Sequence, residues 1–132
     1  MINILLTSHS KKLAQGLKEI MEQMAPDVLI DYSGGTSDGQ IGSNFDEISE
    51  KINKLSEGDG LVVFFDLGSS MMNCQMAIDF LDDDRKSKVI LAGTAYVESS
   101  IQIAVNISAG QSLDDIREFI DTYPINKLDG NM

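Results

Sequence analysis

The sequence predicts an α/β fold: a doubly wound, four-stranded parallel sheet, in the strand order 2-1-3-4, with helices on both faces. Strand-like and helix-like apolar patterns alternate along the chain, as they do when crossover helices link parallel strands. The run 61–65 has five consecutive apolar residues, which indicates a central strand that is buried on both faces. With 132 residues the chain has the length of one domain, so we expect residues 1–132 to form a single domain.

The spacing of apolar residues changes between the first predicted strand and the first predicted helix. Residues 2–7 are mostly apolar, with several β-branched side chains, which predicts a buried strand. From Lys11 the apolar residues recur every three or four positions, which predicts a helix, and Pro26 ends it. The predicted buried stripe of this helix consists of Leu13, Leu17, Ile20, Met21 and Met24.

A second strand and a second helix come next. We expect the strand at 28–32 and a long glycine-rich turn at 34–39. Ser43, with Asp46 three residues later, forms a weak capping box and predicts the start of a helix. The glycine-containing segment 58–60 ends it. The expected buried stripe consists of Phe45, Ile48, Ile52 and Leu55.

The strongest strand signal lies at 61–66, where the apolar run ends in an aspartate. Glycine and serine then lead into a methionine-rich helix at 70–81. Three consecutive aspartates open a charged segment at 82–86, which we expect to be a solvated loop rather than a metal cluster. The fourth strand is expected at 88–92.

The last part of the chain predicts two more helices. Residues 95–108 are apolar on two helical faces, so this helix and the methionines of the helix before it are candidate interface surfaces. Ser112, with Asp115 three residues later, caps the final helix. We expect the residues from Pro124 onward to form a tail.

Charge excludes several classes of partner. Acidic residues outnumber basic residues by 21 to 10, which gives a formal net charge of −11. Since nucleic acids and anionic membranes attract proteins chiefly through Lys and Arg, we expect neither as a partner. A basic protein would be attracted, although an acidic surface also serves simply to keep a protein in solution.

The sequence carries no sign of export or of a metal centre. No apolar run is long enough to cross a membrane, and the first residues show no secretory signal. The single cysteine, Cys74, excludes an internal disulfide and a cysteine-based zinc site. We therefore expect a cytoplasmic protein with no metal and no cofactor.

A histidine and an aspartate are predicted to meet at the carboxyl edge of the sheet. His9, the only histidine, follows the first strand, and Asp66 ends the third. In the order 2-1-3-4 these strands are neighbours, and chemistry gathers where the order reverses between them. A carboxylate on one ring nitrogen fixes the tautomer and leaves a lone pair on the other. We therefore assign His9 as the catalytic nucleophile and Asp66 as the residue that orients it.

Groups that favour an anion surround this predicted pair. They are small or hydroxyl-bearing residues in the turns after the first three strands: Ser10, Gly35, Thr36, Gly68 and Ser69. Backbone N–H groups at helix N-termini favour negative charge, so a histidine that briefly carries a phosphoryl group fits this set. Each of these residues alone is equally explained as an ordinary turn or cap. The chain has no Gly-x-Gly-x-x-Gly motif and no Walker lysine, so it lacks the usual nucleotide-binding loops.

Five motifs, in order along nearly the whole chain, resemble one family. They are Ser8-His9-Ser10, the stretch Met24-Ala-Pro-Asp-Val, Gly34-Gly35-Thr36 with Asp38-Gly39, Ile41-Gly42-Ser43, and Asp66-Leu67-Gly68-Ser69-Ser70 with Met72-Asn73. The sequence resembles the DhaM family, the phosphoryl-carrier subunits of dihydroxyacetone kinases that depend on the phosphotransferase system. The relatives of that family are the mannose-type enzyme IIA domains.

The resemblance implies a specific function. The histidine after the first strand, here His9, would receive a phosphoryl group from phospho-HPr and pass it to ADP on the DhaL subunit. The DhaK subunit, which binds dihydroxyacetone, would act downstream. The relatives place an aspartate against this histidine, and Asp66 matches it. The family also implies a homodimer, while Ser70 stands where many members have alanine.

Other functions remain compatible with some of these residues. A response-regulator receiver is also doubly wound, and Asp66 and Thr94 match its phosphorylated aspartate and its hydroxyl position, but the acidic pair after the first strand is missing. A mannose-type enzyme IIA of a sugar transporter would share the histidine chemistry and differ only in its acceptor. Hydrolysis by a serine–histidine–aspartate set with Ser8 or Ser69 is conceivable, although no Gly-x-Ser-x-Gly elbow is present.

Overall fold

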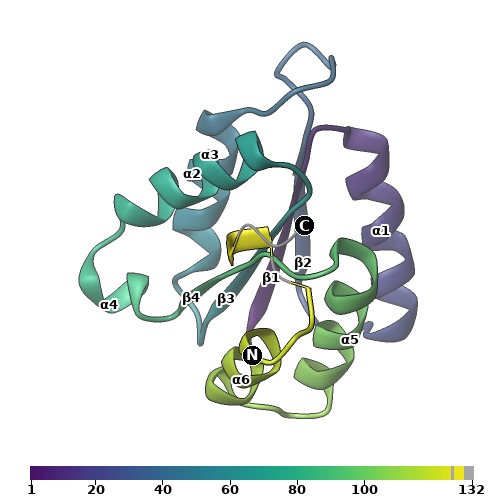
Figure 1. Cartoon of the computed structure of the whole chain (residues 1–132), viewed down its shortest axis with the longest axis vertical. Helices are drawn as coiled ribbons and strands as arrows, with labels where there is room; N and C mark the ends of the chain where they lie inside the picture. The colour runs from purple at the N-terminus through teal and green to yellow at the C-terminus, as the bar shows by residue number, and fades with distance from the viewer. Residues whose placement is uncertain (126, 130–132) are drawn as a thin grey trace.

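The computed structural model describes residues 1–125 and 127–129 and confirms the doubly wound α/β class (Figure 1). Four parallel strands form one sheet in the predicted order, β2-β1-β3-β4. The strands are β1 (Asn3–Ser8), β2 (Ile30–Gly34), β3 (Leu61–Phe65) and β4 (Val89–Ala92). The helices are α1 (Lys11–Met24), α2 (Phe45–Leu55), α3 (Gly68–Asp79), α4 (Asp83–Lys86), α5 (Tyr96–Ser108), α6 (Leu113–Asp121) and the 3-10 helix η1 (Lys127–Asp129). Within the described residues, no helix combines the length and the apolar character needed to cross a membrane.

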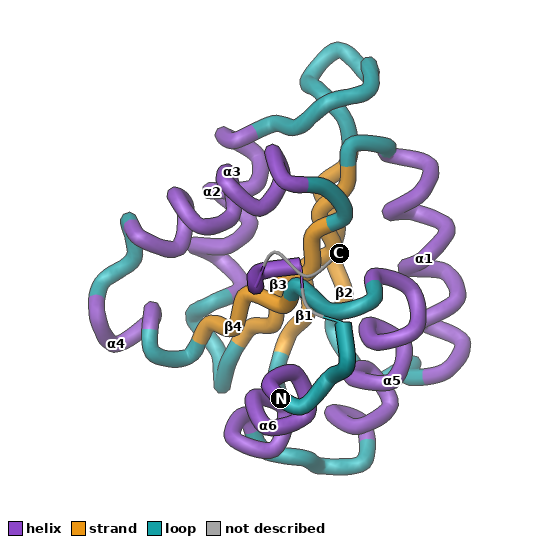
Figure 2. Tube along the Cα trace, in the orientation of Figure 1, coloured by secondary structure: helices purple, strands orange, loops and turns teal. Residues whose placement is uncertain are grey.

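Helices cover both faces of the sheet (Figure 2). Each face has its own apolar cluster. On one face α2 and α3 pack side by side, and Leu5 and Val63 of the central strands are buried against Ile52 of α2. On the other face α1, α5 and α6 bury Leu6 and Phe64. Successive residues of a strand point to opposite faces, so both central strands must be apolar throughout.

The predicted stripe of α1 is only partly correct. Leu17 and Met21 are buried, as expected. Ala14, which the prediction left out, is also fully buried, and the three residues form one narrow inner stripe. Since α1 packs chiefly against β1, β2 and α5, its remaining apolar side chains have no inner surface to cover. The members of the predicted stripe that are about half exposed are Leu13, Ile20 and Met24.

The predicted cap of the second helix is wrong by one residue. Asn44, not Ser43, caps α2, because its side-chain oxygen accepts a hydrogen bond from the amide of Glu47. The Ser43 hydroxyl oxygen instead accepts a hydrogen bond of 2.8 Å from the Asn73 side chain. A cap residue must point its oxygen at the first free amides of the helix, and here Asn44 occupies that position.

The charged segment 82–86 is a short helix rather than the predicted loop. Asp82 caps α4, since its carboxylate accepts a hydrogen bond of 2.9 Å from the Arg85 amide. The capping box of Ser112 and Asp115 at the start of α6 is confirmed. In both places a short polar side chain, of Asp82 or Ser112, accepts a hydrogen bond from a free amide in the first turn of the helix.

Part of the apolar surface of α5 is buried within the chain. Ile103, Ala104 and Ile107 are buried in the cluster that α5 shares with α1 and the sheet. These residues therefore serve the core, whereas Val97 is 40% exposed, and the prediction that this helix supplies an interface stays a prediction. The methionines of α3 do remain on the surface, with Met72 63% and Met76 47% exposed.

The strand register brings two crossover turns together at the carboxyl edge of the sheet. Thr7 of β1 pairs with Phe65 of β3, so the turns after these residues are neighbours. At the end of β2, a Cβ atom on Gly34 would lie 2.6 Å from the Cα atom of Lys11. Only glycine allows this close approach, which sets the start of α1 directly beside β2.

Candidate functional site

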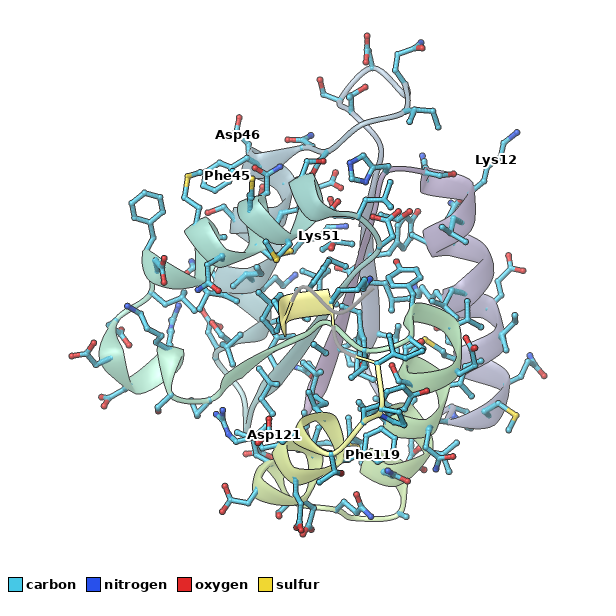
Figure 3. The ribbon with its side chains drawn as sticks, in the orientation of Figure 1. Lys12, Phe45, Asp46, Lys51, Phe119 and Asp121 are labelled. Carbon is cyan, nitrogen blue, oxygen red and sulfur yellow. The ribbon has the colours of Figure 1, made fainter. Side chains whose placement is uncertain are left out.

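His9 and Asp66 form a hydrogen-bonded pair at the carboxyl edge of the sheet. Nδ1 of His9 lies 3.0 Å from Oδ1 of Asp66, and the two side chains are 18% and 13% exposed. The predicted contact between these residues is thereby confirmed. This edge is the end of the molecule where α1 and α2 begin, near the labelled Lys12 and Asp46, opposite the end where Phe119 lies (Figure 3).

The Asp66 carboxylate accepts four hydrogen bonds, two on each oxygen. Oδ2 accepts from the Ser8 hydroxyl at 2.8 Å and from the His9 amide at 2.9 Å. Oδ1 accepts from the Leu67 amide at 2.7 Å and from the His9 ring. Donors face both oxygens, so the proton of a neutral carboxyl group would point toward another donor. This arrangement favours the ionised carboxylate.

These hydrogen bonds keep Asp66 ionised. Burial disfavours the charged form and by itself raises the pKa of Asp66. The hydrogen bonds donated by His9, Ser8 and Leu67 favour the charged form and outweigh burial, so the net pKa lies below the usual value. Asp66 is therefore a carboxylate at neutral pH.

The surroundings of the His9 ring select one tautomer. Because ionised Asp66 can only accept, the proton of the neutral ring sits on Nδ1. The buried Ser70 hydroxyl lies 3.2 Å from the same nitrogen. Nε2 then carries the free lone pair, and the Ser69 hydroxyl donates a hydrogen bond to it. A ring arranged in this way presents one nucleophilic nitrogen at a fixed position.

The start of α3 offers backbone donors beside the ring. No side chain in the described part of the chain caps this helix at Leu67. The amides of Gly68 and Ser69 lie in the first turn, where an α-helix supplies no acceptor of its own. Together with the positive end of the helix dipole, these amides favour an anion close to Nε2 of His9.

The other three predicted anion ligands already have partners. Ser10 caps α1, since its side-chain oxygen accepts a hydrogen bond from an amide of the first turn. The Gly35 amide donates to the Ser8 carbonyl at 3.2 Å. The Thr36 hydroxyl donates to Asp38 within its own turn. All five predicted phosphate ligands lie in the described part of the chain. Among them, Ser69 is the one whose side chain contacts the His9 ring.

Three residues that contact this pair are absent from the predicted phosphoryl-carrier site. Ser8 binds Asp66, and Ser70 lies against His9; both stand inside motifs already singled out, which is the signal that could have found them. Nζ of Lys127 donates to the backbone carbonyl of Asp66 at 2.9 Å. No local pattern connects this lysine, in the predicted tail, with the site.

Asp66 is expected to make the stability of the protein depend on acid pH. Its pKa is lower in the folded state, so between the folded and unfolded pKa values the unfolded chain binds more protons, and stability rises with pH there. The stabilisation is complete above the usual value of 3.8 and is lost as the pH falls through the lower folded value. Urea unfolding of the wild type and of Asp66→Asn across this range measures it. The difference between their free energies of unfolding should shrink in acid, and a constant difference would contradict the prediction.

Comparison with protein families identifies one match. The family model described as the PTS system fructose IIA component, EIIA-man, matches residues 3–117. A PEP-dependent dihydroxyacetone kinase phosphoryl donor subunit, DhaM, of Listeria innocua is 34% identical over 92% of this chain and 94% of that protein. The phosphotransferase subunit DhaM of a PTS-dependent dihydroxyacetone kinase from Lactococcus lactis is 29% identical over 94% of this chain and 97% of its own length.

Solved structures agree with this match. The crystal structure of the unknown function protein EF1359 superposes with a TM-score of 0.80 at 34% identity, covering 96% of this chain and 97% of that one. A phosphotransferase system component EIIA from Streptococcus agalactiae has a TM-score of 0.66 at 13% identity, covering 92% of this chain and 91% of its own. At that identity the second structure supports the fold alone.

Proposed function

Because the chain belongs to the EIIA-man family and, within it, to the DhaM proteins, we propose that it carries a phosphoryl group on Nε2 of His9. The proposed donor is phospho-HPr, and the proposed acceptor is ADP bound to a DhaL subunit, with a DhaK subunit and its dihydroxyacetone downstream. The observation that carries the proposal is the contact of Asp66 with Nδ1, which leaves the Nε2 lone pair beside the start of α3.

Loading of the carrier forms one bond and breaks one. The Nε2 lone pair of His9 attacks the phosphorus atom of the donor in line with the leaving group, and the bond between phosphorus and the donor's carrier atom breaks. The electron pair of the broken bond stays on the donor's carrier atom. The phosphorylated ring keeps its Nδ1 proton and is cationic, and the Asp66 carboxylate stabilises that charge. The hydrogen bond from the Ser69 hydroxyl to Nε2 breaks during the attack. The hydroxyl then donates to a phosphoryl oxygen.

Transfer to the acceptor uses the same geometry. An oxygen of the β-phosphate of ADP attacks phosphorus, the bond from phosphorus to Nε2 breaks, and its electron pair returns to the His9 ring. In this scheme the acceptor subunit binds the nucleotide, and this chain contributes the positioned imidazole. That division of labour fits a chain whose sequence has no glycine-rich nucleotide loop.

The proposed site binds the phosphoryl group only weakly. The group adds about two negative charges to a chain whose formal charge is already −11. The amides of Gly68 and Ser69 and the hydroxyls of Ser69 and Ser10 are the proposed inner ligands. An exposed helix N-terminus contributes about 0.3–1 kcal/mol to such binding. Gly35 and Thr36 are proposed as outer ligands, which would have to exchange their present partners. Weak binding suits a carrier, because it must release the group.

Donor and acceptor are proposed to dock in turn over the same edge. Leu67 and Met72, on the α3 side of His9, are 55% and 63% exposed. On the other side Ile41 is 76% exposed, and the next residue, Gly42, donates its amide to the His9 carbonyl at 3.0 Å. Exposed apolar side chains around a reactive group suit short-lived protein contacts. We also propose a homodimer, which light scattering of the purified protein would test.

Replacing Ser69 by alanine is expected to shorten the lifetime of the phosphorylated form. The variant loses one hydroxyl donor to the phosphoryl group, while the amide of the same residue remains. A single hydrogen bond of this kind corresponds to a two- to tenfold effect, approximately. Intact-mass measurement over time, after the donor is removed, gives the rate of loss. Ser108→Ala, a distant serine that binds Asp27, is the matched control. A lifetime equal to that of the wild type would contradict the role of this hydroxyl.

Reconstitution tests the proposed function as a whole. The protein is incubated with phosphoenolpyruvate, enzyme I and HPr, and an acid-labile phosphate on the intact chain is the expected product. Addition of DhaL with bound ADP should then remove this phosphate and produce ATP. Failure of the first step would refute the carrier function. Success of the first step with no transfer to DhaL would instead favour an enzyme IIA that serves another acceptor.

A further inference from the structure

Lys127, the first residue of η1, connects the C-terminal segment to the end of β3 that carries the site. Its Nζ donates to the backbone carbonyls of Phe65 and Asp66, the latter at 2.9 Å. Its own amide donates to the carbonyl of Gly93 at 2.6 Å. The ammonium group also lies 4.4 Å from the centre of the Phe65 ring and 5.8 Å from that of Tyr96. One residue therefore bridges the ends of β3 and β4 and the start of α5.

The two carbonyls that Nζ binds lie where the sheet stops supplying partners. The last residue of β3 with a partner on β1 is Phe65, opposite Thr7, and the pairing with β4 stops one residue earlier. A carbonyl near the interior costs free energy when it has no donor, so this end of the strand needs a ligand from elsewhere. Lys127 supplies it at the residue where the strand turns into the site.

The position of this backbone decides the position of the carboxylate. Asp66 has a short side chain, and its carboxylate must meet Nδ1 of His9 at 3.0 Å while accepting three further donors. Hydrogen bonds weaken steeply when distance or angle departs from the optimum. A small shift of the Asp66 backbone would therefore weaken the hydrogen bond between its carboxylate and the His9 ring. A misplacement of a reacting group by about 1 Å can lower a reaction rate by about a hundredfold.

We propose that Lys127 is a positioning residue for His9, which acts by fixing the backbone at Asp66. Its effect on phosphoryl loading rests on the proposed function, whereas its effect on the His9 ring does not. The substitution that tests it is Lys127→Met, which keeps an unbranched apolar chain over Phe65 and removes the ammonium group. The matched control is Lys88→Met, since Nζ of Lys88 likewise donates to a backbone carbonyl, at 2.9 Å, but at the opposite edge of the sheet.

The first measurement is the tautomer of the imidazole. His9 is the only histidine, so the ring nitrogen signals of a histidine-labelled sample report on it alone. The wild type and Lys88→Met are expected to show the Nδ1–H form of the neutral ring. Lys127→Met is expected to show a mixture with the Nε2–H form, because the carboxylate no longer fixes the tautomer. Lys127→Arg, which keeps a cationic donor, should return the signals toward those of the wild type.

The second measurement is the rate of phosphoryl loading from phospho-HPr. We expect Lys127→Met to load about three- to tenfold more slowly, the size of effect that one or two hydrogen bonds produce. Lys88→Met should load at the wild-type rate, and Lys127→Arg should recover most of the loss. A purely structural role for Lys127 would lower the melting temperature without changing the tautomer.

The outcomes separate this inference from the proposed function. Wild-type ring signals in folded Lys127→Met overturn the inference, whatever the loading rate. If the wild type takes up no phosphoryl group, the proposed function fails, and the ring signals still decide the role of Lys127. If circular dichroism shows that Lys127→Met is unfolded, Lys127→Gln is measured in the same way. Unchanged ring signals in that variant overturn the inference, and a shifted tautomer supports it.

Discussion

The His9→Ala variant is expected to take up no phosphoryl group and to stay folded. The substitution removes Nε2, the only nitrogen nucleophile that a histidine of this chain can offer. The fold should survive because the side chain belongs to neither apolar cluster, and Asp66 keeps its three other donors. We expect a loss of stability of about 1.5–3 kcal/mol, the range typical of one lost hydrogen bond to a charged group.

Intact mass after incubation with phosphoenolpyruvate, enzyme I and HPr measures the uptake. Circular dichroism and a melting curve of the same sample establish that the variant is folded. The Ser108→Ala protein, changed far from the site, serves as the active control. An acid-labile phosphate on folded His9→Ala would show that another residue is the carrier, and the assignment of His9 would then be wrong.

Replacing Asp66 by asparagine is expected to slow loading by about ten- to a thousandfold, in the range of orienting and charge-stabilising groups. Two effects combine. The neutral amide no longer stabilises the cationic phosphorylated ring. Moreover, each carboxylate oxygen accepts from a backbone amide, Oδ2 from His9 and Oδ1 from Leu67, so either orientation of an asparagine turns its NH2 group against a donor. The substitution therefore disturbs the contact with His9 through its geometry as well as through the loss of charge.

Single-turnover loading from phospho-HPr is the appropriate measurement, because it isolates the chemical step from later transfer. Asp38→Asn is the matched control, because it removes a carboxylate in the turn after β2 that binds Thr36 rather than His9. It should load within about twofold of the wild type, the usual limit for a surface change. Equal rates for Asp66→Asn and Asp38→Asn would contradict the orienting role of Asp66.

The sheet order and the contact of His9 with Asp66 can be predicted from sequence because both depend on strong local patterns. The buried run before Asp66 identifies a central strand, and the alternation of strands and helices leaves few topologies. Once β1 and β3 are neighbours, the residues that follow them must meet. The register that places Thr7 opposite Phe65 then confirms what the pattern implies.

What sequence reasoning misses depends on long-range packing. The stripe of α1 has helical spacing, but spacing does not reveal that β2 and α5 cover only the face of Ala14, Leu17 and Met21. Ser43 and Asn44 are both residue types that cap helices, and the sequence does not reveal that the Ser43 hydroxyl is bound by Asn73, 30 positions away. Lys127 reaches the site across 61 positions of sequence, and no periodicity connects such residues.

The uncapped start of α3 creates a conflict between thermal robustness and activity at one position. A serine or aspartate in place of Leu67 would cap the helix and raise stability by about 0.5–2 kcal/mol, the usual value of an N-cap. Its oxygen would accept a hydrogen bond from the amide of Ser69 or Ser70, and the Ser69 amide is one of those that the proposed phosphoryl group needs. Selection for heat resistance alone would therefore favour a change that blocks the site. A leucine at this position leaves the helix less stable than it could be and keeps those amides available for the cargo.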